Sequence, residues 1–128
     1  MIYEEIYNKL DKLIEDLPNL QQGEYRKSHV NGFMDLHLDV LEVSKSHIKI
    51  ALQHYYTNEG DAIPDPDMEI FINPEQREAE ALSYQDQYGY REVYPEGTVN
   101  PKAKAELNNF LNFWLKNLLS QGHRLKTP

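Results

Sequence analysis

The chain contains no cysteine and comparatively little positive charge. Its 128 residues include 13 Lys and Arg against 21 Asp and Glu, which gives a formal net charge of −8 at pH 7. The lack of cysteine excludes disulfides, a thiol nucleophile and a thiolate metal site. The acidic balance argues against a nucleic-acid partner, because phosphate binding needs a basic face.

Long apolar runs are also missing. No stretch approaches the roughly 20 apolar residues of a membrane-spanning helix. The acidic start of the chain lacks the basic and apolar regions of a signal peptide. We therefore expect no membrane partner and a cytoplasmic location. The length suits one domain over residues 1–128, large enough to bury roughly two thirds of the surface of its unfolded chain.

Apolar residues at helical spacing predict one helix near each end of the chain. The first begins near Ile2 and ends at Leu17, because Pro18 disfavours helical geometry in the residue before it. The second has Asn100 as N-cap, Pro101 in the first turn and Gly122 as C-cap. Its apolar stripe comprises Leu107, Phe110, Leu111, Trp114, Leu115, Leu118 and Leu119.

Between the helices the hydrophobic period changes to two, which is typical of half-buried strands. Residues 33–41 and 48–53 predict a hairpin in which Val40 pairs with Ile50 and Leu38 pairs with Leu52. Further strands are predicted over residues 67–72 and 77–84, and residues 85–94 could add one more. The turn-forming residues of 57–66, including Pro64 and Pro66, predict a loop.

This order of elements predicts an α+β fold. We expect an antiparallel sheet of about four to five strands, with the N-terminal and C-terminal helices packed on one of its faces. The apolar stripes of both helices need a surface to cover them, and the apolar face of the sheet provides it.

The C-terminal half carries a resemblance to a known family. A segment ending in Glu92-Val93-Tyr94-Pro95 precedes the helical run from Glu106 to Leu115, which is followed by Leu118 to His123. This resembles the uncharacterised YqiB-like family of small bacterial proteins, in which a Tyr-Pro pair precedes a final helix with a similar Asn-x-Phe-Leu-x-x-Trp-Leu pattern. The chain departs from that family at Val99 to Lys102. The resemblance implies a bacterial cytosolic protein and supplies no activity and no catalytic residues.

Alternating polar residues give one candidate metal site. Asp35, His37 and Asp39 lie on one face of a predicted strand, where neighbours two residues apart are about 7 Å apart. A metal ion would need His37, one of these aspartates and carboxylates from another strand, such as Asp67 or Glu69. The corresponding function is a small metal-dependent hydrolase. We favour the simpler interpretation, a solvated sheet face whose polar residues alternate with core positions.

An acidic, tyrosine-rich segment is the preferred candidate for a binding surface. Residues 59–96 contain eleven acids and two bases, whereas the rest of the chain contains ten acids and eleven bases. The same segment holds Tyr84, Tyr88, Tyr90 and Tyr94, and tyrosine is enriched at binding surfaces. We predict a non-enzymatic interaction module, without a cofactor, whose partner is a protein with a basic surface.

Two further possibilities stay open. The chain could form a homodimer through sheet edges or exposed aromatic residues. Among the histidines, His54 falls on the core side of its strand, whereas His29, His47 and His123 are expected on the surface or in loops. No serine, phosphate-loop or zinc-protease motif indicates a specific reaction.

Overall fold

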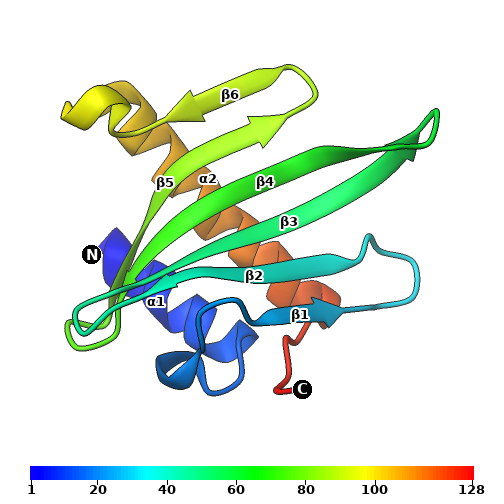
Figure 1. Cartoon of the computed structure of the whole chain (residues 1–128), viewed down its shortest axis with the longest axis horizontal. Coiled ribbons are helices and arrows are strands. Elements are labelled where there is room, and N and C mark those ends of the chain that lie inside the picture. The colour runs from blue at the N-terminus through cyan, green and yellow to red at the C-terminus, as the bar shows by residue number, and fades with distance from the viewer.

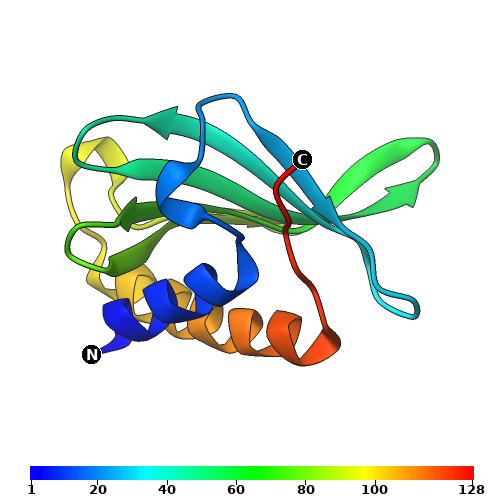
Figure 2. The same cartoon turned by 90° about the horizontal axis from the view of Figure 1, so that it is seen from below.

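A computed structural model describes residues 1–128 and consists of two layers. One layer is a six-stranded antiparallel sheet in the order β1-β2-β3-β4-β5-β6, and the other contains the two α-helices, both on the same face of the sheet (Figures 1 and 2). The elements are α1 (Ile2–Leu13), η1 (Leu17–Asn19), β1 (Tyr25–Ser28), β2 (Leu36–Val43), β3 (Ile48–Asn58), β4 (Asp61–Asn73), β5 (Glu78–Asp86), β6 (Gly89–Glu92), η2 (Pro95–Gly97) and α2 (Pro101–Gln121). The α+β prediction is confirmed, with six strands in place of four or five.

The expected ends of the C-terminal helix are confirmed. The side chain of Asn100 accepts a hydrogen bond from the backbone N–H of Ala103 at 3.1 Å, as an N-cap does. At the other end Gly122 has φ +94°, a left-handed conformation that glycine adopts without a steric penalty. Both signals are local, so α2 is defined by its own sequence.

The N-terminal helix ends earlier than predicted. It stops at Leu13 and not at Leu17, because the chain at Ile14 becomes extended and forms a bridge with Leu125 of the C-terminal tail. Two backbone hydrogen bonds fix this contact, from Leu125 N to Leu13 O at 2.8 Å and from Glu15 N to Leu125 O at 3.0 Å. The end of α1 is therefore set by a tertiary contact more than one hundred residues away in the sequence.

The predicted register of the first hairpin is also confirmed. Val40 pairs with Ile50 and Leu38 with Leu52, and a bulge lies between Val40 and Glu42. All four apolar side chains consequently face the helices. Together with residues of α1, α2 and the connections they form one hydrophobic core. The buried residues that the strands contribute to this core are Leu36, Leu38, Val40, Ile48, Ile50, Leu52, Met68, Ile70, Ile72, Ala79 and Ala81.

Two parts of the sheet differ from prediction. Strand β1 was not predicted, because this four-residue edge strand has little hydrophobic pattern. The predicted loop over residues 57–66 is wrong: only Glu59 and Gly60 make a turn, and the flanking residues pair within the long β3–β4 hairpin. Pro64 and Pro66 are accommodated because β4 pairs with β5 only from Asp67 onward, so this part of β4 is an edge strand.

None of the helices is both long enough and apolar enough to cross a membrane.

Candidate functional site

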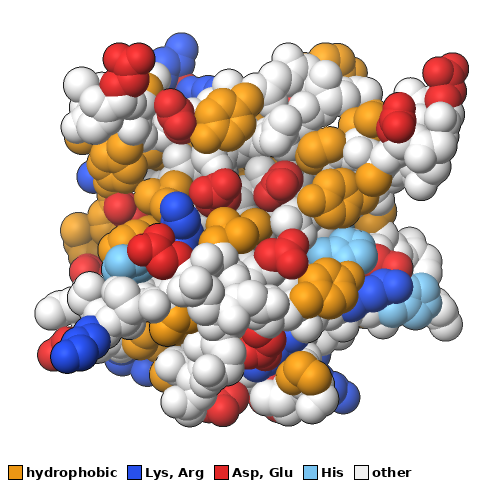
Figure 3. Space-filling model, in the orientation of Figure 1, with side chains coloured by type: hydrophobic (Ala, Val, Ile, Leu, Met, Phe, Trp, Pro, Cys, Tyr) orange, Lys and Arg blue, Asp and Glu red, His pale blue; other side chains and the backbone are white.

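The face of the sheet turned away from both helices, which we call the open face, brings together polar and aromatic side chains from several strands (Figure 3). Strand pairing places them in two adjacent rows that cross β2 to β6. The first row is His37, Gln53, Asp67, Gln85 and Tyr90, and the second is Asp39, Ala51, Glu69, Ser83 and Glu92.

The three carboxylates at the centre of these rows have no positively charged partner. Asp39, Asp67 and Glu69 form no salt bridge, although ion pairs do form elsewhere on the molecule. Burial raises the pKa of the Asp67 carboxyl, and the nearby negative charges of Glu69 and Asp39 raise it further. The centre of the open face is therefore a region of uncompensated negative charge.

A buried glutamine lies among these acids. Gln53 is 5% exposed, and its Nε2 donates a hydrogen bond to Asp39 Oδ2 at 3.1 Å. Its Oε1 is buried and has no hydrogen-bond partner. A buried acceptor without a donor costs free energy, and such groups are rare in folded proteins. The open face thus holds an acceptor that the protein itself does not use.

Aromatic rings flank the acids on the β1 side. The imidazole of His37 lies between two tyrosines, with ring centroids 5.9 Å from Tyr25 and 5.8 Å from Tyr55. Burial lowers the pKa of His37, and the positive charge of Lys27 lowers it further. The pKa of the Tyr55 hydroxyl is raised by burial and by the charges of Asp67 and Asp39. Aromatic rings therefore border the acids of the open face on the β1 side.

The five residues considered as metal ligands are not arranged as a ligand set. Asp35 precedes β2 and contacts His29 Nδ1 at 2.6 Å and Lys27 Nζ at 3.4 Å. His37, Asp39, Asp67 and Glu69 share the open face. No group of three or more His, Asp or Glu side chains in the chain is arranged to hold a metal ion.

The four tyrosines proposed for a binding surface separate into different environments. Tyr90 lies on the open face, where its hydroxyl donates to Glu92 Oε2 at 3.1 Å, and Tyr88 is 87% exposed at the β5–β6 turn. Tyr84 faces the helices and packs edge-on against a phenylalanine of α2, with ring centroids 5.4 Å apart. Tyr94 donates to the carboxylate of Glu80.

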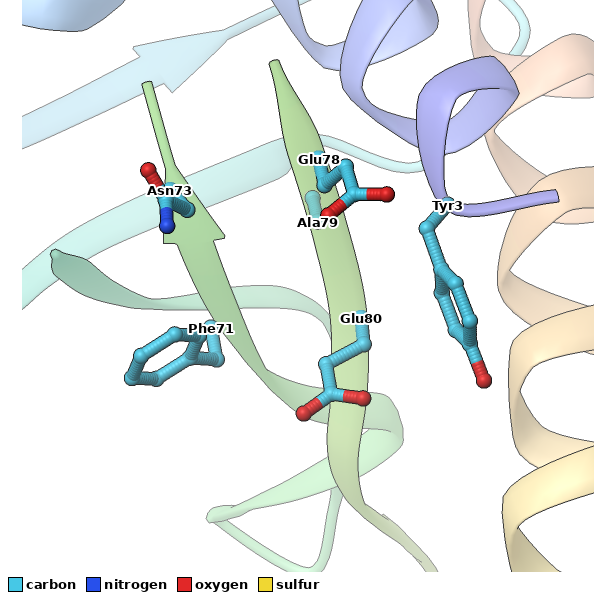
Figure 4. Close-up of a pocket in the computed structure, with 6 residues that line it drawn as sticks. All are labelled: Tyr3, Phe71, Asn73, Glu78, Ala79 and Glu80. Atoms are coloured by element: carbon cyan, nitrogen blue, oxygen red, sulfur yellow. The ribbon is translucent and has the colours of Figure 1, made fainter. Parts of the chain in front are cut away.

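The centre of the open face is a surface and not a pocket. None of the five main pockets is lined by His37, Gln53 or Asp67. One pocket of about 260 Å³ lies at the far end of β4 and β5, where Tyr3 of α1 approaches the free edge of β5 (Figure 4). It is lined by Tyr3, Phe71, Asn73, Glu78, Ala79 and Glu80.

The burial of one histidine was not predicted. His123 was expected on the surface or in a loop; it follows α2 in an irregular segment but is fully buried, with its Nδ1 2.8 Å from the Ser28 hydroxyl and its ring 6.0 Å from that of His54. His54 was expected on the core side, and this is confirmed by its edge contact with Trp114. No local pattern marks His123, because its burial results from the return of the tail toward β1.

Tyr25 and Gln53 were also missed as part of a site. The two-residue period of β3 already placed Gln53 on the polar side of its strand, but its burial could not be read from that period. Tyr25 belongs to β1, which the sequence analysis did not predict.

No curated protein and no solved structure is significantly similar to the chain. A family profile described as "Domain of unknown function (DUF6908)" matches residues 8–124, nearly the whole length. This match agrees with the expectation of an uncharacterised family. The chain belongs to the DUF6908 family of domains of unknown function.

Proposed function

We propose that this domain is a non-enzymatic interaction module whose open face receives the basic surface of a partner protein. The observation that carries the proposal is the set of three carboxylates, Asp39 of β2 and Asp67 and Glu69 of β4, which share the open face and have no positively charged partner. Opposite charge on a partner would compensate them and would steer the encounter.

The shape and composition of the face support the same function. Small ligands usually bind in pockets, whereas protein partners bind to broad surfaces with tyrosine among their contacts. Tyr25 and Tyr90 are 50% and 56% exposed at opposite sides of the acids. Part of each ring is thus available to a partner without any change in the fold.

The test compares two double variants that change the net charge equally. Asp67→Asn/Glu69→Gln removes charge from the open face, and Glu4→Gln/Glu5→Gln removes it from the exposed side of α1. A synthetic peptide of alternating glycine and basic residues is the probe, with binding measured by isothermal titration calorimetry at low and moderate salt. We expect loss of binding only for the open-face variant. Equal loss for both variants would contradict the proposal, because net charge alone would then explain the binding.

A metal-dependent hydrolase and a homodimer stay predictions. Thermal melts with Zn²⁺, Mn²⁺ or Ca²⁺ test the first, because an ion bound only by the folded state raises the melting temperature. Sedimentation velocity over a range of concentrations tests the second. A cytoplasmic location also stays a prediction, and a bacterial origin rests on the resemblance to the YqiB-like family.

A further inference from the structure

Building on the proposed function, we infer that the centre of the open face is a subsite for one arginine side chain of the partner. The guanidinium would donate hydrogen bonds to Gln53 Oε1 and to the carboxylate of Asp67, its cross-strand neighbour. Asp39 and Glu69 would supply further negative charge from the adjacent row.

Gln53 Oε1 has no hydrogen-bond partner, and this indicates that the ligand is a hydrogen-bond donor. Gln53 Nε2 is already held by Asp39, so the amide orientation is fixed and Oε1 is left as the free end. Its hydrogen-bonded neighbour Asp39 and its cross-strand neighbour Asp67 are carboxylates, which accept hydrogen bonds and do not donate them when ionised. No group of the chain donates to Oε1, so a donor from the partner would satisfy it.

The surroundings favour a guanidinium over an ammonium. A guanidinium presents several N–H groups in one plane, which suits two acceptors that stand side by side on neighbouring strands. It is also more weakly hydrated than an ammonium and stacks on aromatic rings, and Tyr55 lies beside the acids. A lysine would gain the same charge attraction but fewer directed hydrogen bonds.

Gln53 Oε1 is buried, so a guanidinium reaches it only after the side chains that cover it move. Gln53 and Ala51 are on the open face and yet buried, so longer neighbouring side chains cover them. Asp67 and Tyr55 are half-buried and can change rotamer. A bound guanidinium would take the place of the covering atoms.

The experiment uses two peptides that differ only in the basic residue, Gly-Arg-Gly-Arg-Gly and Gly-Lys-Gly-Lys-Gly, both with blocked ends. Each is titrated into the full chain, and the side-chain amide signal of Gln53 is followed by NMR together with the dissociation constant. We expect the arginine peptide to bind about tenfold more tightly, as one added charge-assisted hydrogen bond allows. We also expect it alone to shift the Gln53 amide signal.

Variants test which residues cause the preference for the arginine peptide. Gln53→Met removes the acceptor at similar volume and should abolish the arginine preference while leaving weak binding of both peptides. Gln76→Met, in the exposed β4–β5 turn, is the matched control and should keep the preference. Asp67→Asn, at a half-buried position, should weaken binding of both peptides and gives an independent reading if Gln53→Met does not fold.

The outcomes separate this inference from the proposed function. Equal affinity of the wild type for the two peptides would overturn the arginine subsite and leave a charge-based interaction face. A preference that survives Gln53→Met would also overturn it. No binding of either peptide would overturn both proposals.

Discussion

Buried polar groups on the two faces of the sheet differ in how completely they are hydrogen-bonded. On the helix side, Asn108 is 2% exposed and both ends of its amide are used: Oδ1 accepts from Ala81 N at 2.8 Å and Nδ2 donates to Lys104 O at 2.8 Å. Arg26 is similarly satisfied by the backbone oxygens of Glu15 and Leu125. On the open face, Gln53 keeps one end of its amide free, and Asp67 has no partner.

This difference indicates that the helix side stabilises the fold, whereas the open face is suited to recognition. The helix side combines an apolar core with paired polar groups, which is what stability requires. The open face holds groups that are unfavourable in the isolated domain, and such departures concentrate at functional sites. His123 Nε2 is the exception on the helix side, because it is buried and has no hydrogen-bond partner.

The strongest test of this comparison replaces adjacent residues that face opposite sides of β4. Ile70→Ala opens a cavity in the core and should lower the free energy of unfolding by about 3 kcal/mol. Glu69→Ala, next along the strand and on the open face, should change it by no more than about 0.5 kcal/mol. Urea denaturation measures both. Similar losses would mean that the open face also contributes to stability.

An intermediate effect is expected from the buried histidine. Burial lowers the pKa of His123 below its ordinary value of 6.5, and the neighbouring His54 lowers it further. As the pH falls below about 6.5, His123 binds a proton in the unfolded chain but not in the folded chain, so the stability should fall. This loss continues until the pH reaches the lowered pKa of the folded state. Thermal melts between pH 7.5 and 5 measure it.

A variant isolates this contribution from that of another histidine. The pKa of His29 is raised by its hydrogen bond to Asp35, so its stabilisation is present at low pH and is lost as the pH rises through its folded-state value. The two slopes have opposite sign. His123→Gln should therefore flatten the decline below pH 6.5, and an unchanged decline would show that His123 is not its source.

The smallest effect is expected on the open face. Asp67→Asn removes a charge whose pKa is raised by burial and by neighbouring acids, so it should leave the stability unchanged or raise it by less than about 1 kcal/mol. Differential scanning calorimetry at pH 7 measures the change. A clear destabilisation would indicate that Asp67 serves the fold and would remove the contrast between the two faces.

Local signals predicted a large part of the fold. The capping residues Asn100 and Gly122 gave the ends of α2, and the two-residue period gave the register of β2 with β3. Prediction failed where pairing overrode local preference. The prolines of residues 61–66 indicate a loop in isolation, yet this segment pairs with β3 in a hairpin that extends beyond its neighbours.

The candidate site was only partly visible in the sequence. The acidic composition of residues 59–96 pointed to β4 and β6, and Asp67, Glu69 and Tyr90 do lie on the open face. Tyr84 belongs to the same tract but faces the helices, because a bulge between Glu69 and Ile70 of β4 and their β5 partners changes which residues share a face.

The sequence by itself determined the class of elements, the apolar face of the sheet and the excess of acid, because these depend on composition and period. Only the tertiary structure decided which side chains meet. Strand pairing placed Asp39 of β2 and Gln53 of β3 among the acids of β4, and it buried Gln53 with one oxygen free. The physical reason is that burial and hydrogen bonding depend on neighbours from other strands, which no local pattern specifies.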